Sequence, residues 1–236
     1  MSGEINTIIL VAFAFLPPII YAIWIRNKEK YNKEKWFPLS IAFIWAASIA
    51  VLASLILEFL LSIPLAFSFY DIGLISLIIA SVIAPFAEEL TKPLSLYFKR
   101  IKIELDEPED GLIFGAVAGL GFSATENLFY GMGFMSEGDL GYFISMMFMR
   151  SIGACLLHAS ATAWTGYGIG KMVMEKKTIS YVFPYFLIAF FMHGVYNFVL
   201  SFDIFGALFG LIIAFGFTFI MFYYVIDKIK KLDNIH

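Results

Sequence analysis

The chain has 236 residues, 61% of them hydrophobic and 15% charged, and its formal net charge is −3. A soluble domain is nearer half apolar, so this composition excludes an ordinary water-soluble domain and indicates a protein that crosses a membrane several times. The sequence has no basic patch with interleaved aromatic residues, which argues against a nucleic acid partner. Its single cysteine, Cys155, excludes an intrachain disulfide and a cysteine-based metal site.

Apolar segments follow one another along the chain, and each is long enough to cross about 30 Å of hydrocarbon as a helix. They are too long for barrel strands and lack the alternation of such strands. We therefore predict an all-α, polytopic transmembrane helix bundle that forms one integral membrane domain over residues 1–236. The seven predicted spans are Ile5–Ile25, Phe37–Leu61, Asp71–Phe98, Gly111–Met132, Gly141–Met172, Tyr181–Leu200 and Phe205–Ile226.

Apart from Lys92 and Arg150, the basic residues lie in or beside alternate connections. Lys and Arg clusters follow the first, third, fifth and seventh spans, whereas residues 62–70, 133–140 and 201–204 contain neither. By the positive-inside rule, this pattern predicts a multi-pass protein of the cell membrane with its N-terminus outside and its C-terminus in the cytoplasm. The acidic run at 106–110 is then expected to be a solvated cytoplasmic turn that caps the fourth span.

The third span contains three ionisable residues in an otherwise apolar segment: Glu88, Glu89 and Lys92. Each charge at bilayer depth costs about 2.5–3.5 kcal/mol, so such residues usually mark a functional site that faces the bundle interior. Helical spacing lets Glu88 pair with Lys92, whereas Glu89 points about 100° away. Pro85 and Pro93 each remove a helical hydrogen bond, and the freed carbonyls predict a water-holding cavity beside the carboxylates.

Further polar side chains lie at a similar depth in three other spans: Glu126, His158, His193 and Asn197. They and Glu88 lie about 16–25 Å from the predicted cytoplasmic helix ends, so four helices place polar groups in one layer. Small residues on the fourth and fifth spans let those helices approach closely, which turns Glu126 and His158 toward other helices. Arg150 is expected nearer the outer surface, without a catalytic role.

Each of these residues also has a structural interpretation. His158 could be an interhelical hydrogen bonder, Glu126 the partner of Lys92 or of a histidine, and the Glu88–Lys92 motif a plain ion pair. Taken together, however, carboxylates, two histidines and an amide suit hydrolysis by an activated water. Glu88, oriented with His158, would be the general base, and the spacing leaves open whether Glu89 takes this role instead. His193 and Asn197 lie four residues apart and would donate to the oxyanion.

A zinc ion is the alternative way to activate water. Two histidines and carboxylates could bind zinc with one open position. The sequence has no HExxH motif, and the EExxK motif (88–92) puts an ammonium group beside the candidate ligands. We therefore favour a glutamate mechanism without a cofactor over a metalloprotease mechanism.

The order of the motifs adds a resemblance to a known family. EELTK (88–92), GFSATENLFYG (121–131), the mid-helix His158 and HGVYN (193–197) resemble the PrsW family of intramembrane proteases, which is similar to the CAAX prenyl protease and bacteriocin-processing (CPBP) group. The resemblance implies a catalytic core over residues 71–200. It also implies water activation by Glu88 and His158, an oxyanion site at His193 and Asn197, and a membrane-anchored substrate such as an anti-sigma factor.

The chain departs from the prenyl-protease branch at two positions. That branch is typified by EExxxR, whereas this chain has Lys92 one position before the place of that arginine. The branch also has an aromatic residue four positions before its first histidine, where this chain has Ala154. These departures argue against prenylated substrates, and Glu126 with Asn127 favours the PrsW branch.

Two rival functions remain open. Intramembrane Glu, Lys and His also form proton relays in transporters, although the sequence shows no internal repeat. A non-catalytic scaffold could instead bind single-span partners through small-residue faces. A proton-coupled transporter would show flux that depends on Glu88, whereas a scaffold would keep its function in Glu88→Gln. The sequence leaves the oligomeric state open.

Overall fold

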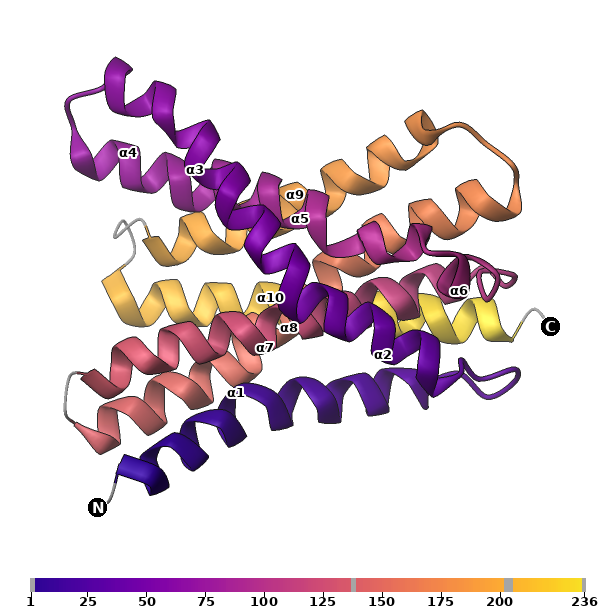
Figure 1. Ribbon diagram of the computed structural model, residues 1–236, viewed down its shortest axis with the longest axis horizontal. Coiled ribbons are helices and arrows are strands. Elements are labelled where there is room, and N and C mark those ends of the chain that lie inside the picture. Colours follow the sequence, from indigo (N-terminus) through magenta and orange to yellow (C-terminus); the bar gives the residue numbers. More distant parts are fainter. Residues whose placement is uncertain (1–2, 137–138, 202–205, 235–236) are drawn as a thin grey trace.

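The computed structural model describes residues 3–136, 139–201 and 206–234. Every regular element in these ranges is helical. Figure 1 shows the helices side by side in an elongated bundle, with the start of α1 and the end of α10 at opposite ends. The α-helices are α1 (Gly3–Arg26), α2 (Trp36–Trp45), α3 (Val51–Ser68), α4 (Ile72–Ile78), α5 (Ala84–Thr91), α6 (Lys99–Lys102), α7 (Asp110–Ser136), α8 (Leu140–Met174), α9 (Phe183–Ser201) and α10 (Gly206–Asp233).

The described residues contain seven helical segments that are long and apolar enough to cross a membrane, which confirms the prediction of a multi-pass helix bundle. The second span continues to Ser68, past the predicted end at Leu61. Phe205, the predicted start of the last span, lies outside the described residues. The membrane side of each terminus stays a prediction. The observed segments are Thr7–Arg26, Trp36–Ser68, Ile72–Tyr97, Asp110–Ser136, Leu140–Met174, Ile179–Ser201 and Leu208–Asp233.

Helices α7 and α8 form the centre of the bundle, and they approach through glycines. A Cβ atom built on Gly115 would lie 2.5 Å from the carbonyl oxygen of Thr162, and one on Gly119 would overlap the carbonyl of His158. Only residues without a side chain allow two backbones this close. The small-residue face predicted on these helices is therefore present, and it brings His158 of α8 next to Glu126 of α7.

The third span is not one continuous α-helix. A π-helical turn (Ile79–Ile83) separates α4 from α5, and a 3₁₀ segment (Lys92–Tyr97) follows α5. The carbonyl of Ala80 accepts a hydrogen bond from Asn197 Nδ2 at 2.9 Å, and that of Thr91 accepts one from Trp45 Nε1 at 3.2 Å. Side chains of neighbouring helices thus bind backbone carbonyls at both irregular turns, as a membrane interior requires.

The close approach of α7 and α8 at their glycines can be tested by substitution. Gly119→Ala should lower the thermal unfolding midpoint of the purified protein, because the new methyl group would overlap the His158 carbonyl and overpacking costs about 1–3 kcal/mol. Gly133→Ala is the matched control in α7, since a Cβ there meets nothing within 4 Å. Alanine favours a helix by about 0.5–1 kcal/mol, so the control should hold or raise the midpoint. Equal responses of both variants would contradict this packing.

Candidate active site

Lys92 lies at the centre of a buried polar cluster. Its Nζ atom is 2.7 Å from Glu89 Oε1 and 2.9 Å from Glu88 Oε2, and the side chain is fully buried. The expectation that only Glu88 would face Lys92 was wrong. Helix α5 ends at Thr91 and the chain tightens into the 3₁₀ segment at Lys92, so the ammonium reaches both the i−3 and the i−4 carboxylate.

His158 extends this cluster from α5 to α7. Its Nδ1 atom lies 2.8 Å from Lys92 Nζ, and its Nε2 atom lies 2.8 Å from Glu126 Oε2. An ammonium group can only donate hydrogen bonds, so Nδ1 accepts and the ring proton is assigned to Nε2, which donates to Glu126. Both nitrogens of His158 are therefore occupied by protein partners.

Arg150 also joins the cluster, through Glu126. Its Nη2 atom donates to Glu126 Oε2 at 2.9 Å, and its Nε atom donates to Asn127 Oδ1 at 2.9 Å. The expectation that Arg150 would extend toward the outer surface was therefore wrong, because a half-buried carboxylate within reach is a stronger partner than the interface. Of the partners considered for Glu126, the histidine is confirmed.

Glu89 is the most fully occupied carboxylate of the cluster. Its Oε1 atom accepts from Lys92, and its Oε2 atom accepts from Thr162 Oγ1 at 2.8 Å. His193 Nδ1 lies 2.9 Å from Glu89 Oε1, and a carboxylate partner assigns the ring proton to this nitrogen. Nε2 is then the nitrogen through which His193 could act on a bound molecule.

Glu88 differs from Glu89 in its hydrogen bonding. Its Oε2 atom lies 3.9 Å from His158 Nδ1 and from His193 Nδ1, and it touches Lys92 without forming a well-aligned hydrogen bond. Oε2 is buried, and its ion-pair contact with Lys92 at 2.9 Å leaves part of its acceptor capacity unused. Glu88 therefore has acceptor capacity that a bound water or substrate could use.

A cavity of about 450 Å³ opens beside Glu88, in agreement with the cavity predicted from the prolines. Glu126, Asn197 and Glu58 of α3 also line this cavity. The other members of the buried cluster do not line it and lie behind its wall: Glu89, Lys92, His158 and His193. The other lining residues are Val51, Ser54, Leu55, Ser76, Ile79, Ala80, Ala84, Phe122, Phe129 and Tyr130. Six of the seven predicted site residues thus form one contiguous network, and Asn197 shares its cavity while binding the Ala80 carbonyl.

Sequence reasoning missed two residues of this site. Glu58 is a carboxylate inside the second span, and the rarity of such residues was a signal that could have identified it. Thr162 gives no comparable signal, because a threonine within a span commonly bonds its own backbone. Only the packing of α8 against α5 shows that its hydroxyl donates to Glu89.

The side chains of Glu88, His158 and His193 are also a candidate metal site, because one ligand atom from each lies within 4.8 Å of the others. Two histidines and a carboxylate form a common catalytic zinc donor set. His158 Nδ1 and Glu88 Oε2 are 3.9 Å apart and both contact the Lys92 ammonium. A zinc ion about 2.1 Å from both His158 Nδ1 and Glu88 Oε2 would lie almost midway between these two atoms and close to the Lys92 ammonium, which would repel it. With Lys92 in place, these residues do not fit a zinc ion.

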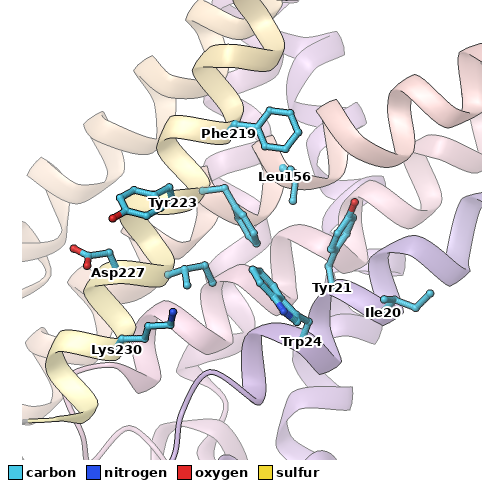
Figure 2. Close-up of a pocket in the computed structure, with 10 residues that line it drawn as sticks. Ile20, Tyr21, Trp24, Leu156, Phe219, Tyr223, Asp227 and Lys230 are labelled. Carbon is cyan, nitrogen blue, oxygen red and sulfur yellow. The ribbon is translucent and has the colours of Figure 1, made fainter.

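A larger groove of about 650 Å³ lies between α1 and α10. Figure 2 shows Tyr21 and Trp24 on α1 facing α10, where Asp227 and Lys230 lie near one end of the groove. None of the residues of the buried cluster lines this groove. The candidate active site is therefore the smaller cavity beside Glu88.

The chain forms a seven-span helix bundle, and a buried network of carboxylates, histidines and a lysine lies beside a cavity in it. It is therefore a membrane protein with a polar site inside the bilayer region. A sequence profile described as "PrsW family intramembrane metalloprotease" matches residues 34–226, which is most of the chain. The chain therefore belongs to the PrsW family of intramembrane proteases.

Individual relatives agree with this assignment. Protease PrsW of Clostridioides difficile (strain 630) is 27% identical over 229 residues, which cover 95% of this chain and 92% of that protein. Protease PrsW of Geobacillus kaustophilus (strain HTA426) is 27% identical over 81% of this chain and 79% of its own. Protease PrsW of Bacillus subtilis (strain 168) is 25% identical over 81% of this chain and 83% of its own. No solved structure matches the chain.

The central position of Lys92 gives a second test. Lys92→Met would leave Glu88 and Glu89 buried without their ammonium partner, and removing one member of a buried ion pair costs about 3–5 kcal/mol. The thermal unfolding midpoint should fall strongly. Lys231→Met is the control, because Lys231 pairs with Asp227 on the surface and is 72% exposed, and it should leave the midpoint nearly unchanged. A Lys92→Met protein as stable as wild type would refute this central role.

Proposed function

We propose that the protein is a metal-free intramembrane endopeptidase that hydrolyses a peptide bond of a membrane-anchored protein, with Glu88 as the general base. The observation that carries this proposal is the contrast between the two adjacent carboxylates. Both oxygens of Glu89 have hydrogen-bond partners, whereas the buried Oε2 atom of Glu88 has only its 2.9 Å ion-pair contact with Lys92 and no aligned hydrogen bond in the described residues, and Glu88 lines the cavity. A general base needs such an unused acceptor within hydrogen-bond reach of water.

In the proposed reaction, Glu88 takes a proton from a water in the cavity, and the resulting hydroxide adds to the carbonyl carbon of the scissile bond. The carbonyl oxygen becomes an oxyanion. When the C–N bond breaks, the protonated Glu88 returns the proton to the leaving amine. Water is thus divided between a new carboxyl terminus and a new amino terminus, and no further reactant is needed.

The surrounding residues have positioning and electrostatic roles in this proposal. Lys92 balances the charge of the two carboxylates and fixes Glu88 at 2.9 Å. Glu89 holds His193 through Nδ1, which leaves Nε2 to donate to the oxyanion when the ring is protonated. Asn197 already donates to the Ala80 carbonyl, so its proposed oxyanion contact requires that bond to be exchanged on substrate binding.

The cavity suits a peptide in the membrane. Its walls combine aliphatic and aromatic residues of α3, of the π-helical turn after α4 and of α7 with the carboxylate of Glu58. Apolar walls accept the side chains of a span, and a few polar groups fix the backbone, as in other substrate sites. The proposed substrates are therefore single-span proteins, including regulators such as anti-sigma factors, that unwind near the cavity to expose one peptide bond.

The proposal is tested by comparing protein N-termini in membranes of cells that make the wild-type protein or Glu88→Gln. Wild type should produce new termini near the ends of membrane spans, and Glu88→Gln should reduce them by about 10²–10⁴-fold, the usual contribution of a general base. Glu175→Gln is the control, because this carboxylate is exposed and pairs only with Lys171 in the described residues.

If wild type and Glu88→Gln give the same termini while both are folded and expressed, the protease proposal is rejected. The continuous chain of Glu89, Lys92, His158 and Glu126 would then favour a proton relay. Flux across sealed vesicles that depends on Glu88 would identify a transporter, and function retained in Glu88→Gln would identify a scaffold.

Removal of transition metals tests the metal-free mechanism separately. Proteolysis by the purified protein should survive 1,10-phenanthroline, because the Lys92 ammonium lies where His158 and Glu88 would have to hold a metal ion. Elemental analysis of the same preparation should show no stoichiometric zinc. Inactivation by the chelator, reversed by added zinc, would contradict the glutamate mechanism while leaving the protease assignment intact.

A further inference from the structure

A second cluster of buried acids lies at the end of the bundle where α1 ends and α7 begins. Glu29 and Glu34 come from the loop between α1 and α2, and they meet Glu107 and Asp110 at the start of α7. Glu29 is fully buried, while Asp110 and Glu34 are 2% and 4% exposed. The acidic run at 106–110 is thus only partly the solvated turn that the sequence suggested: Asp106 is exposed, whereas Glu109 and Asp110 are buried.

In the part of the chain that the structure describes, this cluster has no partner among the protein's cations. Within the described residues, Glu29, Glu34, Glu107 and Asp110 form no ion pair with a Lys, Arg or His side chain. The neighbouring Lys35 pairs with Glu104 instead, at 2.8 Å. Burying one unpaired carboxylate is already costly, so several together favour a bound proton or a bound cation.

Two contacts show that the cluster is incomplete. Glu29 Oε2 accepts the backbone N–H of Glu34 at 3.0 Å, but Glu29 Oε1 is buried without a hydrogen-bond partner. The carboxyl groups of Glu34 and Asp110 are also in hydrogen-bonding contact, although two carboxylates are both acceptors. Such a contact requires a shared proton or a bridging cation.

The oxygen positions suit a hard cation. One oxygen each from Glu29, Glu107 and Asp110 lies within 4.8 Å of the others. Two opposite ligands of a calcium ion, each about 2.4 Å from it, are separated by about the same distance. Carboxylate oxygens are the preferred ligands of Ca²⁺ and Mg²⁺, and no thiol or imidazole that would favour a softer metal belongs to this group of ligands.

We propose that Glu29, Glu107 and Asp110, supported by Glu34, bind a hard divalent cation of the Ca²⁺ or Mg²⁺ class. The site is separate from the catalytic cluster and does not depend on the proposed protease mechanism. It joins the α1–α2 loop to the start of α7. Asp233 at the end of α10 is joined to the same loop, because its carboxylate accepts the N–H groups of Lys30 and Tyr31. The cation therefore links the α1–α2 loop to the start of α7, while Asp233 links the end of α10 to the same loop.

Protons are the competing occupants of this site. Burial raises the pKa of Glu29 to about 8, even though the hydrogen bond from the Glu34 amide opposes this rise. A cation that replaces these protons should bind more tightly as the pH increases and should release protons on binding. An experiment must therefore distinguish stabilisation by a cation from stabilisation by acid.

The test uses the full-length protein in detergent, treated with EDTA and dialysed. CaCl₂ and MgCl₂ are added separately, with NaCl of equal ionic strength as the control, while the unfolding midpoint and the bound metal are measured. At about 100 times the dissociation constant, the preferred cation should raise the midpoint by about 5 °C or more. NaCl should not, and the difference between CaCl₂ and MgCl₂ identifies the ion.

Variants link this effect to the cluster. Glu29→Gln should abolish both bound metal and the rise in the midpoint. Glu107→Gln, at the partly exposed rim, should reduce the affinity by at least about tenfold and keeps the test decisive if Glu29→Gln does not fold. Glu175→Gln, an exposed carboxylate after α8, should behave as wild type. Stabilisation by low pH with neither cation bound, or metal binding that survives Glu107→Gln unchanged, would overturn the proposal.

Discussion

The ammonium group of Lys92 contacts Glu88, Glu89 and His158 at 2.9, 2.7 and 2.8 Å and lies over the ring of Phe122. A buried ammonium of this kind is tolerated only when its acceptors surround it. Its contacts fix the two adjacent carboxylates in different environments. They also determine the hydrogen-bonding direction of His158 and, through it, the link to Glu126 and Arg150. The site's charge distribution therefore depends on this side chain.

The backbone is arranged so that this contact can form. Glycines on α7 let α8 approach until the His158 carbonyl lies over Gly119, and Gly194 of α9 lets that helix approach the Ser81 carbonyl in the π-helical turn. The π-helical turn and the 3₁₀ segment then place Glu88, Glu89 and Lys92 at one level between these helices. Irregular backbone within a span is found where it lines a polar cavity, and here that cavity adjoins Glu88.

Much of this architecture was predictable, because membrane burial makes each charged residue informative. Hydropathy gave the seven spans, and the rarity of intramembrane charge marked Glu88, Glu89, Lys92 and Glu126. The prediction from ideal α-helix geometry, which paired Lys92 with Glu88 alone, failed because the helix changes from α to 3₁₀ at Lys92. Arg150 was misplaced because a long side chain can point either way, which only a nearby acceptor decides. The burial of Asp110 at the end of the acidic run depends on a loop from elsewhere in the chain, which no local pattern shows.

The most direct test of the central claim separates catalysis from stability in Glu88→Gln and Glu89→Gln. Single-turnover hydrolysis of a membrane-anchored substrate by the reconstituted protein would be measured beside the unfolding midpoint of each variant. The account predicts that Glu88→Gln loses hydrolysis and keeps a near-native midpoint, whereas Glu89→Gln loses stability because it disrupts contacts with Lys92, Thr162 and His193. Hydrolysis that persists in Glu88→Gln and vanishes in a stably folded Glu89→Gln protein would contradict it and make Glu89 the base.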